Sequence, residues 1–265
     1  MVDAKLTVSV CLPARNEEAT VGAIVATVVA ELAGLVDEVV VVDDGSTDAT
    51  AAVAATAGAK VVSADRPGKG QALWKAMFVA SGELLVFCDA DIRHFSAGFV
   101  TALLEPLLAS ERIAFVKGFY QRPDGGGRVT ELVARPVLSL LFPELAGILQ
   151  PLAGEFASRR HVLERVPFTA DYGVDLGLLV DVWRLVGLEG LAQADLGVRH
   201  HRNRPLDDLG PQAVQVLRAA LDRAGVAVSG PPTSQCPPLV EVPAYVAARR
   251  AVTTASTQAA TSDTA

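Results

Sequence analysis

Two acidic side chains, Asp89 and Asp91, directly follow an apolar stretch at residues 84–88 whose composition predicts a buried strand. In an extended chain, residues two apart point to the same side, so both carboxylates can face one cation. A hard divalent cation such as Mg²⁺ or Mn²⁺ prefers oxygen ligands and can bridge the phosphates of a nucleotide diphosphate. An isolated Asp-X-Asp is more often a solvated turn, so this interpretation depends on the other motifs of the chain.

A second acidic pair, Asp43 and Asp44, ends the valine-rich stretch at residues 39–42. A helix is predicted to start soon after it, with Ser46 or Thr47 as its cap. Carboxylates at the carboxyl end of a strand can accept hydrogen bonds from a base or a ribose, and a helix start offers free backbone amides. A capped turn without a ligand would use the same residue types.

Two further loops carry charged residues ahead of predicted helices. One covers residues 13–18 and contains Arg15 and Glu17, and the other covers residues 66–70 and places Lys69 between two glycines. A lysine in this position can reach a phosphate, but the complete phosphate-loop pattern is absent, which argues against an NTPase. The first loop, taken alone, could simply start a helix.

These motifs lie at the ends of predicted strands or the starts of predicted helices, which alternate through the first half of the chain. The alternation predicts an α/β fold with a mostly parallel sheet flanked by helices, and with functional loops at the carboxyl ends of the strands. The predicted strands cover residues 8–12, 38–42, 60–63 and 84–88, and the predicted helices cover residues 17–32, 47–57 and 70–80.

The second half of the chain is less regular and is predicted to form a smaller, mostly helical part. Helices are predicted at residues 129–141, with a kink near Pro136, and at residues 175–186 and 206–224. Residues 229–265 are rich in Pro, Ser, Thr and Ala and show little periodicity. Much of this tail is therefore predicted to be flexible.

Composition limits the classes of protein to consider. The chain has 265 residues, of which 51% are hydrophobic and 20% charged, enough for one sizeable globular domain. A net charge of −7 argues against a nucleic-acid-binding protein and against attachment to anionic lipid. Three cysteines do not suggest a disulfide framework, and neither a signal peptide nor a run of about 18 apolar residues is evident. We therefore expect a cytoplasmic protein without a membrane partner.

The motifs together resemble the glycosyltransferases with the A-type, Rossmann-like nucleotide-binding fold. Further motifs downstream narrow the resemblance to the glucosyl-3-phosphoglycerate synthase family, over about residues 8–224. These motifs are residues 127–136, 149–155, 172–175 and 198–205. The resemblance implies a metal-dependent, retaining hexosyltransferase that moves glucose from UDP-glucose to 3-phosphoglycerate, giving glucosyl-3-phosphoglycerate and UDP. It also implies a homodimer.

The resemblance implies a role for individual residues. The nucleotide sugar would be bound by Pro13, Ala14, Arg15, Glu17, Asp43, Lys69 and Asp89. The divalent metal, Mg²⁺ or Mn²⁺, would be held by Asp91 and His201. The phosphoglycerate would be bound by Gly127, Arg128, Thr130 and Asn203, and catalysis would involve Lys69, Asp91 and Asp175. Residues 1–118 would then bind the nucleotide sugar, residues 119–226 would bind the acceptor and complete the metal site, and residues 227–265 would form the flexible tail.

Two residues depart from the pattern of that family: Asp44 stands where it often has Ser, and Asp175 stands where it often has Glu. The shorter carboxylate at residue 175 can change the geometry, the preferred sugar or the rate. Asp89 and Asp91 are too close in sequence to flank a scissile bond as glycosidase carboxylates do. We therefore expect the leaving diphosphate oxygen to act as the base.

Three alternatives stay open at the level of sequence. A mannosyl-3-phosphoglycerate synthase using GDP-mannose would carry similar diphosphate and metal motifs. A polyprenyl-phosphate glycosyltransferase would share the first half but should have an amphipathic or membrane-spanning segment. A non-catalytic protein that binds a nucleotide sugar is disfavoured by Asp91, His201 and Arg128. Without the resemblance, the basic residues at 199–204 would also suit a solvated loop.

Overall fold

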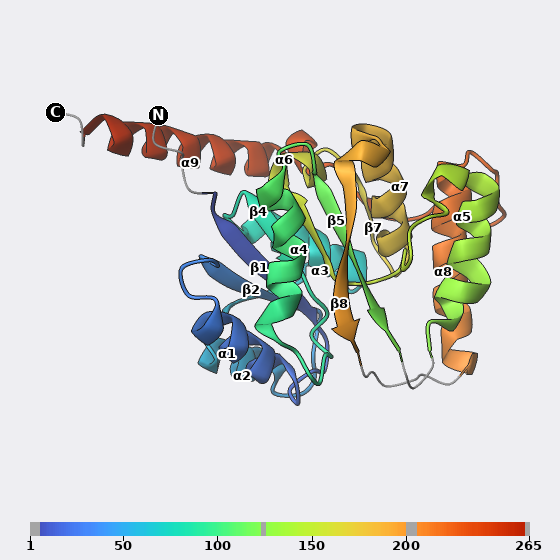
Figure 1. Ribbon diagram of the computed structural model, residues 1–265, viewed down its shortest axis with the longest axis horizontal. Coiled ribbons are helices and arrows are strands. Elements are labelled where there is room, and N and C mark those ends of the chain that lie inside the picture. The colour runs from blue at the N-terminus through green and yellow to red at the C-terminus, as the bar shows by residue number, and fades with distance from the viewer. Residues whose placement is uncertain (1–5, 123–125, 200–205, 263–265) are drawn as a thin grey trace.

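The computed structural model describes residues 6–122, 126–199 and 206–262. One mixed sheet runs through the centre of the molecule, helices cover both of its faces, and a long C-terminal helix extends away from the rest (Figure 1). The predicted α/β fold with a mostly parallel sheet flanked by helices is confirmed.

The central sheet has seven strands in the order β3-β2-β1-β4-β6-β5-β8. Strand β6 is antiparallel to both of its neighbours, and the other paired strands are parallel. The strands are β1 (Val8–Ala14), β2 (Glu38–Asp43), β3 (Lys60–Ser63), β4 (Leu84–Phe87), β5 (Phe115–Gln121), β6 (Phe156–Arg159) and β8 (Leu191–Val198). Because the first four are parallel, the loops that follow β1, β2 and β4 meet at one edge of the sheet.

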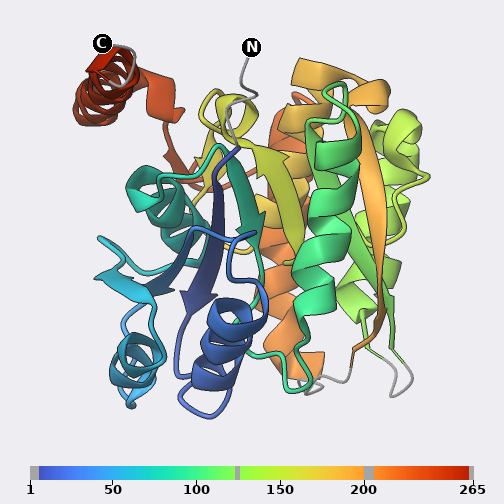
Figure 2. The ribbon, with the colours of Figure 1, turned by 60° about the vertical axis from the view of Figure 1, so that its left-hand side comes forward.

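Two hydrophobic cores lie on the two faces of this sheet. Along β1, Val10 and Leu12 belong to one core and Cys11 to the other, as the alternation of side chains in a strand requires. The first core is completed by α1 (Val21–Glu31), α2 (Thr50–Thr56) and α4 (Ala97–Ala109). The second is completed by α3 (Lys69–Val79) and α7 (Val174–Val186). Figure 2 shows these layers from the side.

The smaller helical part packs outside α7. It contains a π-helical turn (Thr130–Ala134), α5 (Arg135–Leu141) and α8 (Leu206–Arg223), with α8 in contact with both α5 and α7. Near Pro136, where a kink is predicted, the π-helical turn changes to α-helix, and the proline has no N–H to donate to the preceding turn. The remaining short elements are two 3₁₀ turns (Pro143–Leu145 and Leu188–Gly190) and α6 (Arg160–Leu163), which follows β6 and lies near the long C-terminal helix (Figure 1).

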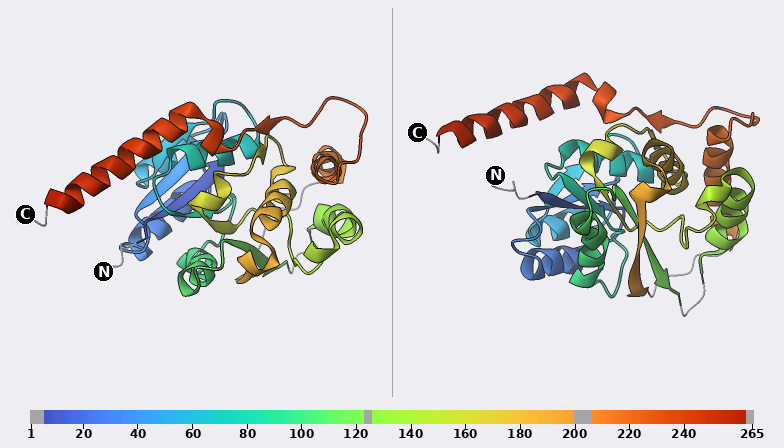
Figure 3. Two further views of the ribbon diagram at one scale, coloured as in Figure 1. Left: turned by 90° about the horizontal axis from the view of Figure 1, so that it is seen from above. Right: turned by 45° about the horizontal axis from the view of Figure 1, so that its top comes forward.

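The C-terminal segment differs from the flexible tail that its composition predicts. Strand β9 (Gln235–Cys236) pairs with β7 (Phe168–Thr169), a 3₁₀ turn follows at Leu239–Glu241, and α9 covers Pro243–Ser262 (Figure 3). Cys236, Leu239 and Tyr245 are buried against the second core. These three buried side chains do not recur at a helical or strand period, so the hydrophobic pattern of the sequence does not reveal them.

The starts of the first two helices also differ from the prediction. Helix α1 begins at Val21, because the loop after β1 bends back at Asn16, whose φ is 56°. Neither Ser46 nor Thr47 caps α2; Asp48 accepts a hydrogen bond from the Thr50 backbone N–H, and Ser46 Oγ accepts one from the Asn16 N–H. The loops after β1 and β2 are therefore joined to each other.

Among the residues that the structure describes, no helix is both long enough and apolar enough to cross a bilayer.

Candidate active site

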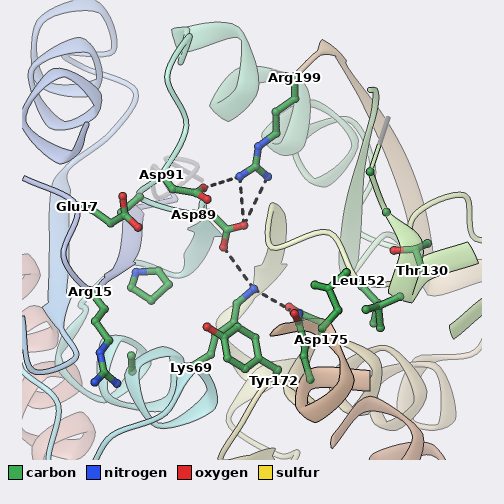
Figure 4. A pocket seen from close by; sticks show the side chains of 18 of the residues that line it. Arg15, Glu17, Lys69, Asp89, Asp91, Thr130, Leu152, Tyr172, Asp175 and Arg199 are labelled. Atoms are coloured by element: carbon green, nitrogen blue, oxygen red, sulfur yellow. Dashed lines mark hydrogen bonds and ion pairs between the residues drawn. The ribbon is translucent and has the colours of Figure 1, made fainter. Parts of the chain in front are cut away.

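A cavity of about 380 Å³ opens at the carboxyl edge of β1, β2 and β4 and extends toward the smaller helical part. Its walls come from the loops after these strands, from the start of α3, from the π-helical turn and from the segment before α7 (Figure 4). Most of the residues proposed from sequence line it: Pro13, Ala14, Arg15, Glu17, Lys69, Asp89, Asp91, Gly127, Arg128, Thr130 and Asp175.

Lys69 lies at the centre of the cavity wall, at the first position of α3. Its Nζ is 3.0 Å from Asp175 Oδ2 and 3.3 Å from Asp89 Oδ1. Burial favours the neutral amine, but Asp175 and Asp89 outweigh it and raise the pKa of Lys69. Lys69 is therefore a fixed cation that joins the end of β4 to the start of α7.

The glycines beside Lys69 have a packing role. A Cβ at Gly70 would overlap the carbonyl oxygen of Thr169 in β7, and Gly68 has a φ of 135° and lies against the carbonyl of Ala170. The glycines thus let the loop approach the β7 backbone closely, which fixes where the lysine side chain begins.

Arg199 is the second cation of the site and binds three carboxylates. Its Nη1 lies 2.5 Å from Glu155 Oε1 and 3.5 Å from Asp89 Oδ2, and its Nη2 lies 2.6 Å from Asp91 Oδ1. The residue is 5% exposed and also donates a hydrogen bond to the Tyr120 hydroxyl. The interpretation of residues 199–204 as a solvated basic loop is therefore wrong for Arg199.

The two aspartates after β4 have different surroundings. Asp89 contacts both Lys69 and Arg199; burial alone would raise its pKa, but these two cations lower it to about 2. It is packed so closely against Gly154 that a Cβ there would overlap its carboxylate. The Asp91 side chain is 49% exposed, and Arg199 is its ion-pair partner. Of the pair, Asp91 is the more available to a ligand in the cavity.

On one side of the cavity, the two acidic residues after β2 have different surroundings. Asp43 accepts a hydrogen bond from the Ser46 N–H and does not belong to the cavity wall. Asp44 does line the cavity, where it accepts a hydrogen bond from the Gly68 N–H and lies 4.0 Å from Arg15 Nη1. Asp43 was predicted to bind the nucleotide sugar, but it is Asp44 that lines the cavity.

Glu17 forms another part of this wall, close to Asp91. Partial burial, followed by repulsion from Asp91, raises the pKa of Glu17 to about 7.

On the opposite side, Gly127, Arg128 and Thr130 line the cavity, with Arg122 and Tyr120 beside them. That the first three bind the acceptor stays a prediction. Gly127 has a φ of 68°, and a Cβ there would overlap the Arg122 guanidinium. His201 and Asn203 lie outside the described residues, so their proposed roles stay predictions. Within the described part of the chain, no three His, Cys, Asp or Glu side chains converge as a metal-binding group.

Several residues of the site were not singled out from the sequence. Leu152, Glu155, Tyr172 and Arg199 lie within the motifs of the family resemblance, but these motifs alone indicate no role for them. Tyr120 and Arg122 line the cavity from a stretch without a motif. One signal was available for Lys117: a lysine inside an otherwise apolar strand, in a position where a charge needs a partner.

Comparison with known proteins agrees with this geometry. Residues 9–166 match the family model of Glycosyl transferase family 2. The glucosyl-3-phosphoglycerate synthase of Mycolicibacterium smegmatis is 50% identical over 241 residues, covering 84% of this chain and 80% of the relative. That of Petrotoga mobilis is 42% identical over 236 residues, covering 82% and 73%.

Solved structures extend the comparison to bound ligands. The Mycobacterium tuberculosis glucosyl-3-phosphoglycerate synthase in complex with Mn²⁺, UDP-glucose and phosphoglyceric acid has a TM-score of 0.84 and 46% identity, covering 89% of this chain and 90% of that one. A second structure of that enzyme contains Mn²⁺, UDP and glucosyl-3-phosphoglycerate; it has a TM-score of 0.84 and 45% identity, with 89% and 91% covered.

A mostly parallel sheet flanked by helices, with paired aspartates after β4, defines a glycosyltransferase with the A-type fold. Within Glycosyl transferase family 2, the chain belongs to the glucosyl-3-phosphoglycerate synthase family.

Proposed function

We propose that this protein transfers glucose from UDP-glucose to 3-phosphoglycerate, giving glucosyl-3-phosphoglycerate and UDP. The observation that carries the proposal is one cavity with acidic groups, Asp89 and Asp91, on one side and Arg128 on the other. The Mycobacterium tuberculosis enzyme, with 45–46% identity and the same fold, has been solved with UDP-glucose and phosphoglyceric acid and with UDP and the glucosylated product. The arrangement suits a donor diphosphate and a small anionic acceptor in one chamber.

The residues present fit a divalent cation. Asp91 offers a half-exposed carboxylate at the cavity, and carboxylate oxygens are the ligands that Mg²⁺ and Mn²⁺ prefer. We therefore expect Asp91 to hold the cation, with His201 as the second ligand that the family resemblance implies. When bound, such a cation neutralises charge on the nucleotide diphosphate.

Lys69 is positioned to stabilise negative charge on the donor side. It is already ordered by Asp89 and Asp175, so it needs no reorganisation when a diphosphate leaves. Asp175 orients the ammonium and lines the cavity beside Tyr172, where a sugar would be held. Retention of configuration, with the leaving oxygen as base, stays a prediction.

The acceptor side supplies the donors that a phosphate and a carboxylate require. Arg128 can make forked hydrogen bonds to either group, Thr130 can donate from its hydroxyl, and Arg122 stands next to them. An acidic protein can bind such an acceptor only through a local group of this kind.

A measurement of UDP release over a panel of donors and acceptors tests the proposal. UDP-glucose with 3-phosphoglycerate should give the highest rate, and omission of 3-phosphoglycerate should leave only slow hydrolysis. Asp91→Ala, added as a matched control, should be folded and inactive. A higher rate with GDP-mannose would make the protein a mannosyl transferase, and no nucleotide release with any pair would favour the non-catalytic alternative.

We also propose a cytoplasmic location and a homodimer. The location is supported by the three cysteines, all buried free thiols, which suit a reducing compartment. The dimer rests on the family resemblance, and sedimentation of the purified protein would test it.

A further inference from the structure

Lys117 is a buried charged residue that the proposed function does not yet use. It lies in β5, opposite Phe156 of β6, and is 2% exposed. Its Nζ lies 5.3 Å from the centroid of the Phe156 ring. Lys117 is not part of the cavity wall, so it cannot touch either substrate. Burying an ammonium group is costly unless charges around it compensate.

The charges around Lys117 are those of the active site. They are Asp175 at the start of α7, Lys69 at the start of α3, Glu155 before β6 and Asp89 after β4, with the influence of Asp175 the largest. Glu155 and Asp175 are almost fully buried, and each has one carboxylate oxygen without a hydrogen-bond partner. A buried ammonium nearby offsets the charge of such carboxylates, because a medium of low dielectric constant screens it little.

The balance of charges in the site also indicates that Lys117 offsets negative charge there. Lys69 and Arg199 are bonded to a set of four carboxylates, namely Asp89, Asp91, Glu155 and Asp175. Burial raises the pKa of Glu155 to about 7, so this carboxyl is only partly ionised near neutral pH. Even without its charge, the three aspartates outnumber the two cations by one, and the Lys117 ammonium offsets that excess.

We propose that Lys117 is a positioning residue for glucosyl transfer, whose buried ammonium offsets the negative charge of Asp175 and so helps to hold Lys69 in place. This inference rests on the proposed function. A purely structural lysine would affect stability alone. The charge of Lys117 is expected to affect turnover, although its side chain contacts no substrate.

The state of Lys117 predicts a pH dependence for turnover. Burial lowers the pKa of Lys117 to about 8, whereas the pKa of Lys69 is raised and that of Tyr120 is raised to about 12. Between about pH 8 and 10, Lys117 is then the group in this set that loses its charge. Stability moves in the opposite direction: over this range the unfolded chain binds the proton and the folded one does not, so this group makes folding more favourable as pH rises. If turnover falls in this pH range, unfolding caused by the deprotonation of Lys117 is therefore not the reason.

The test compares Lys117→Met with a matched control, Lys75→Met. Lys75 also lies over a phenylalanine ring, with Nζ 5.9 Å from the Phe78 centroid, but pairs with Asp65 outside the site. With UDP-glucose, 3-phosphoglycerate and Mg²⁺, Lys117→Met should lower kcat by about 10- to 100-fold, since small misplacements of catalytic groups have effects of this size. Both KM values should stay within about threefold, and Lys75→Met should match the wild type.

The pH dependence of wild-type kcat tests the role of Lys117 even if the Lys117→Met variant does not fold. At saturating substrates, kcat of the wild type should fall above about pH 8 while its circular dichroism is unchanged. A profile that stays flat to pH 10, or a folded Lys117→Met with wild-type kcat, would overturn the inference and leave the proposed function intact. A wild type that transfers no glucose would contradict the proposed function instead.

Discussion

At the scale of single residues, the site is organised by two cations that connect carboxylates from separate segments. Lys69 joins Asp89 to Asp175, and Arg199 joins Asp89 and Asp91 to Glu155. Removing one member of a buried set of this kind leaves its partners uncompensated, so the members act as a unit.

Asp175 provides a direct test of this unit. Asp175→Asn removes the charge that orients Lys69, and we expect kcat to fall by about 10- to 100-fold while the fold is kept. Asp175→Glu keeps the charge on a longer side chain and should lose less. Steady-state kinetics on both variants measures the difference; an Asn variant as active as the Glu variant would show that the charge of Asp175 has no part in turnover.

Arg128 tests the acceptor side. Arg128→Ala should raise the KM for 3-phosphoglycerate at least about tenfold, because a charge-assisted fork to phosphate or carboxylate is lost. Arg128→Lys should recover only part, since a point charge cannot replace the fork. The Kd of UDP-glucose, measured by calorimetry without acceptor, should stay within about threefold. An equal loss of donor affinity would move Arg128 to the nucleotide side.

The sequence was informative for residues whose position follows from a strand end. Lys69, Asp89 and Asp91 were placed at the carboxyl edge because apolar strands and glycine-flanked loops are local patterns. Which of Asp43 and Asp44 faces the cavity does not follow from the local sequence. It depends on the turn after β2, which directs Asp43 to Ser46 and Asp44 to Gly68. Arg199 was missed for the same reason, because Glu155 and Tyr120, which bury it, are distant in sequence.

At the scale of elements, the site depends on a short sheet that lies behind the Lys69 loop. Strand β7 packs against Gly68 and Gly70, and β9 pairs with β7. Trp74 of α3 donates a hydrogen bond to the Pro237 carbonyl just after β9. The C-terminal segment therefore supports the position of Lys69 from behind.

Two truncations separate the supporting part of this segment from the rest. A chain ending at Arg250 keeps Cys236, Leu239 and Tyr245 and should unfold at nearly the wild-type temperature. A chain ending at Gly230 loses all three, and because burial of each large apolar side chain contributes about 1.5–3 kcal/mol, Tm should fall by roughly 10 °C. Its kcat should also fall, as β7 loses its partner. Equal melting temperatures for the two chains would contradict this role of β9.

At the scale of the whole molecule, the sheet brings together residues from both halves of the chain. The first half supplies Lys69 and the aspartates after β4, whereas Glu155, Asp175 and Arg199 come from the second. The antiparallel strand β6 makes this possible, since it returns between β4 and β5 and starts at the residue after Glu155. The residues proposed to bind the donor and those proposed to bind the acceptor consequently line one cavity (Figure 4).

Analysis of the product by NMR tests the central claim most directly. The protein is incubated with UDP-glucose, 3-phosphoglycerate and Mg²⁺, beside Asp91→Ala under the same conditions. We predict α-configured glucosyl-3-phosphoglycerate in amounts equal to the UDP released, and no product from the variant. Release of UDP with free glucose alone, or a variant that matches the wild type in excess chelator, would contradict the account.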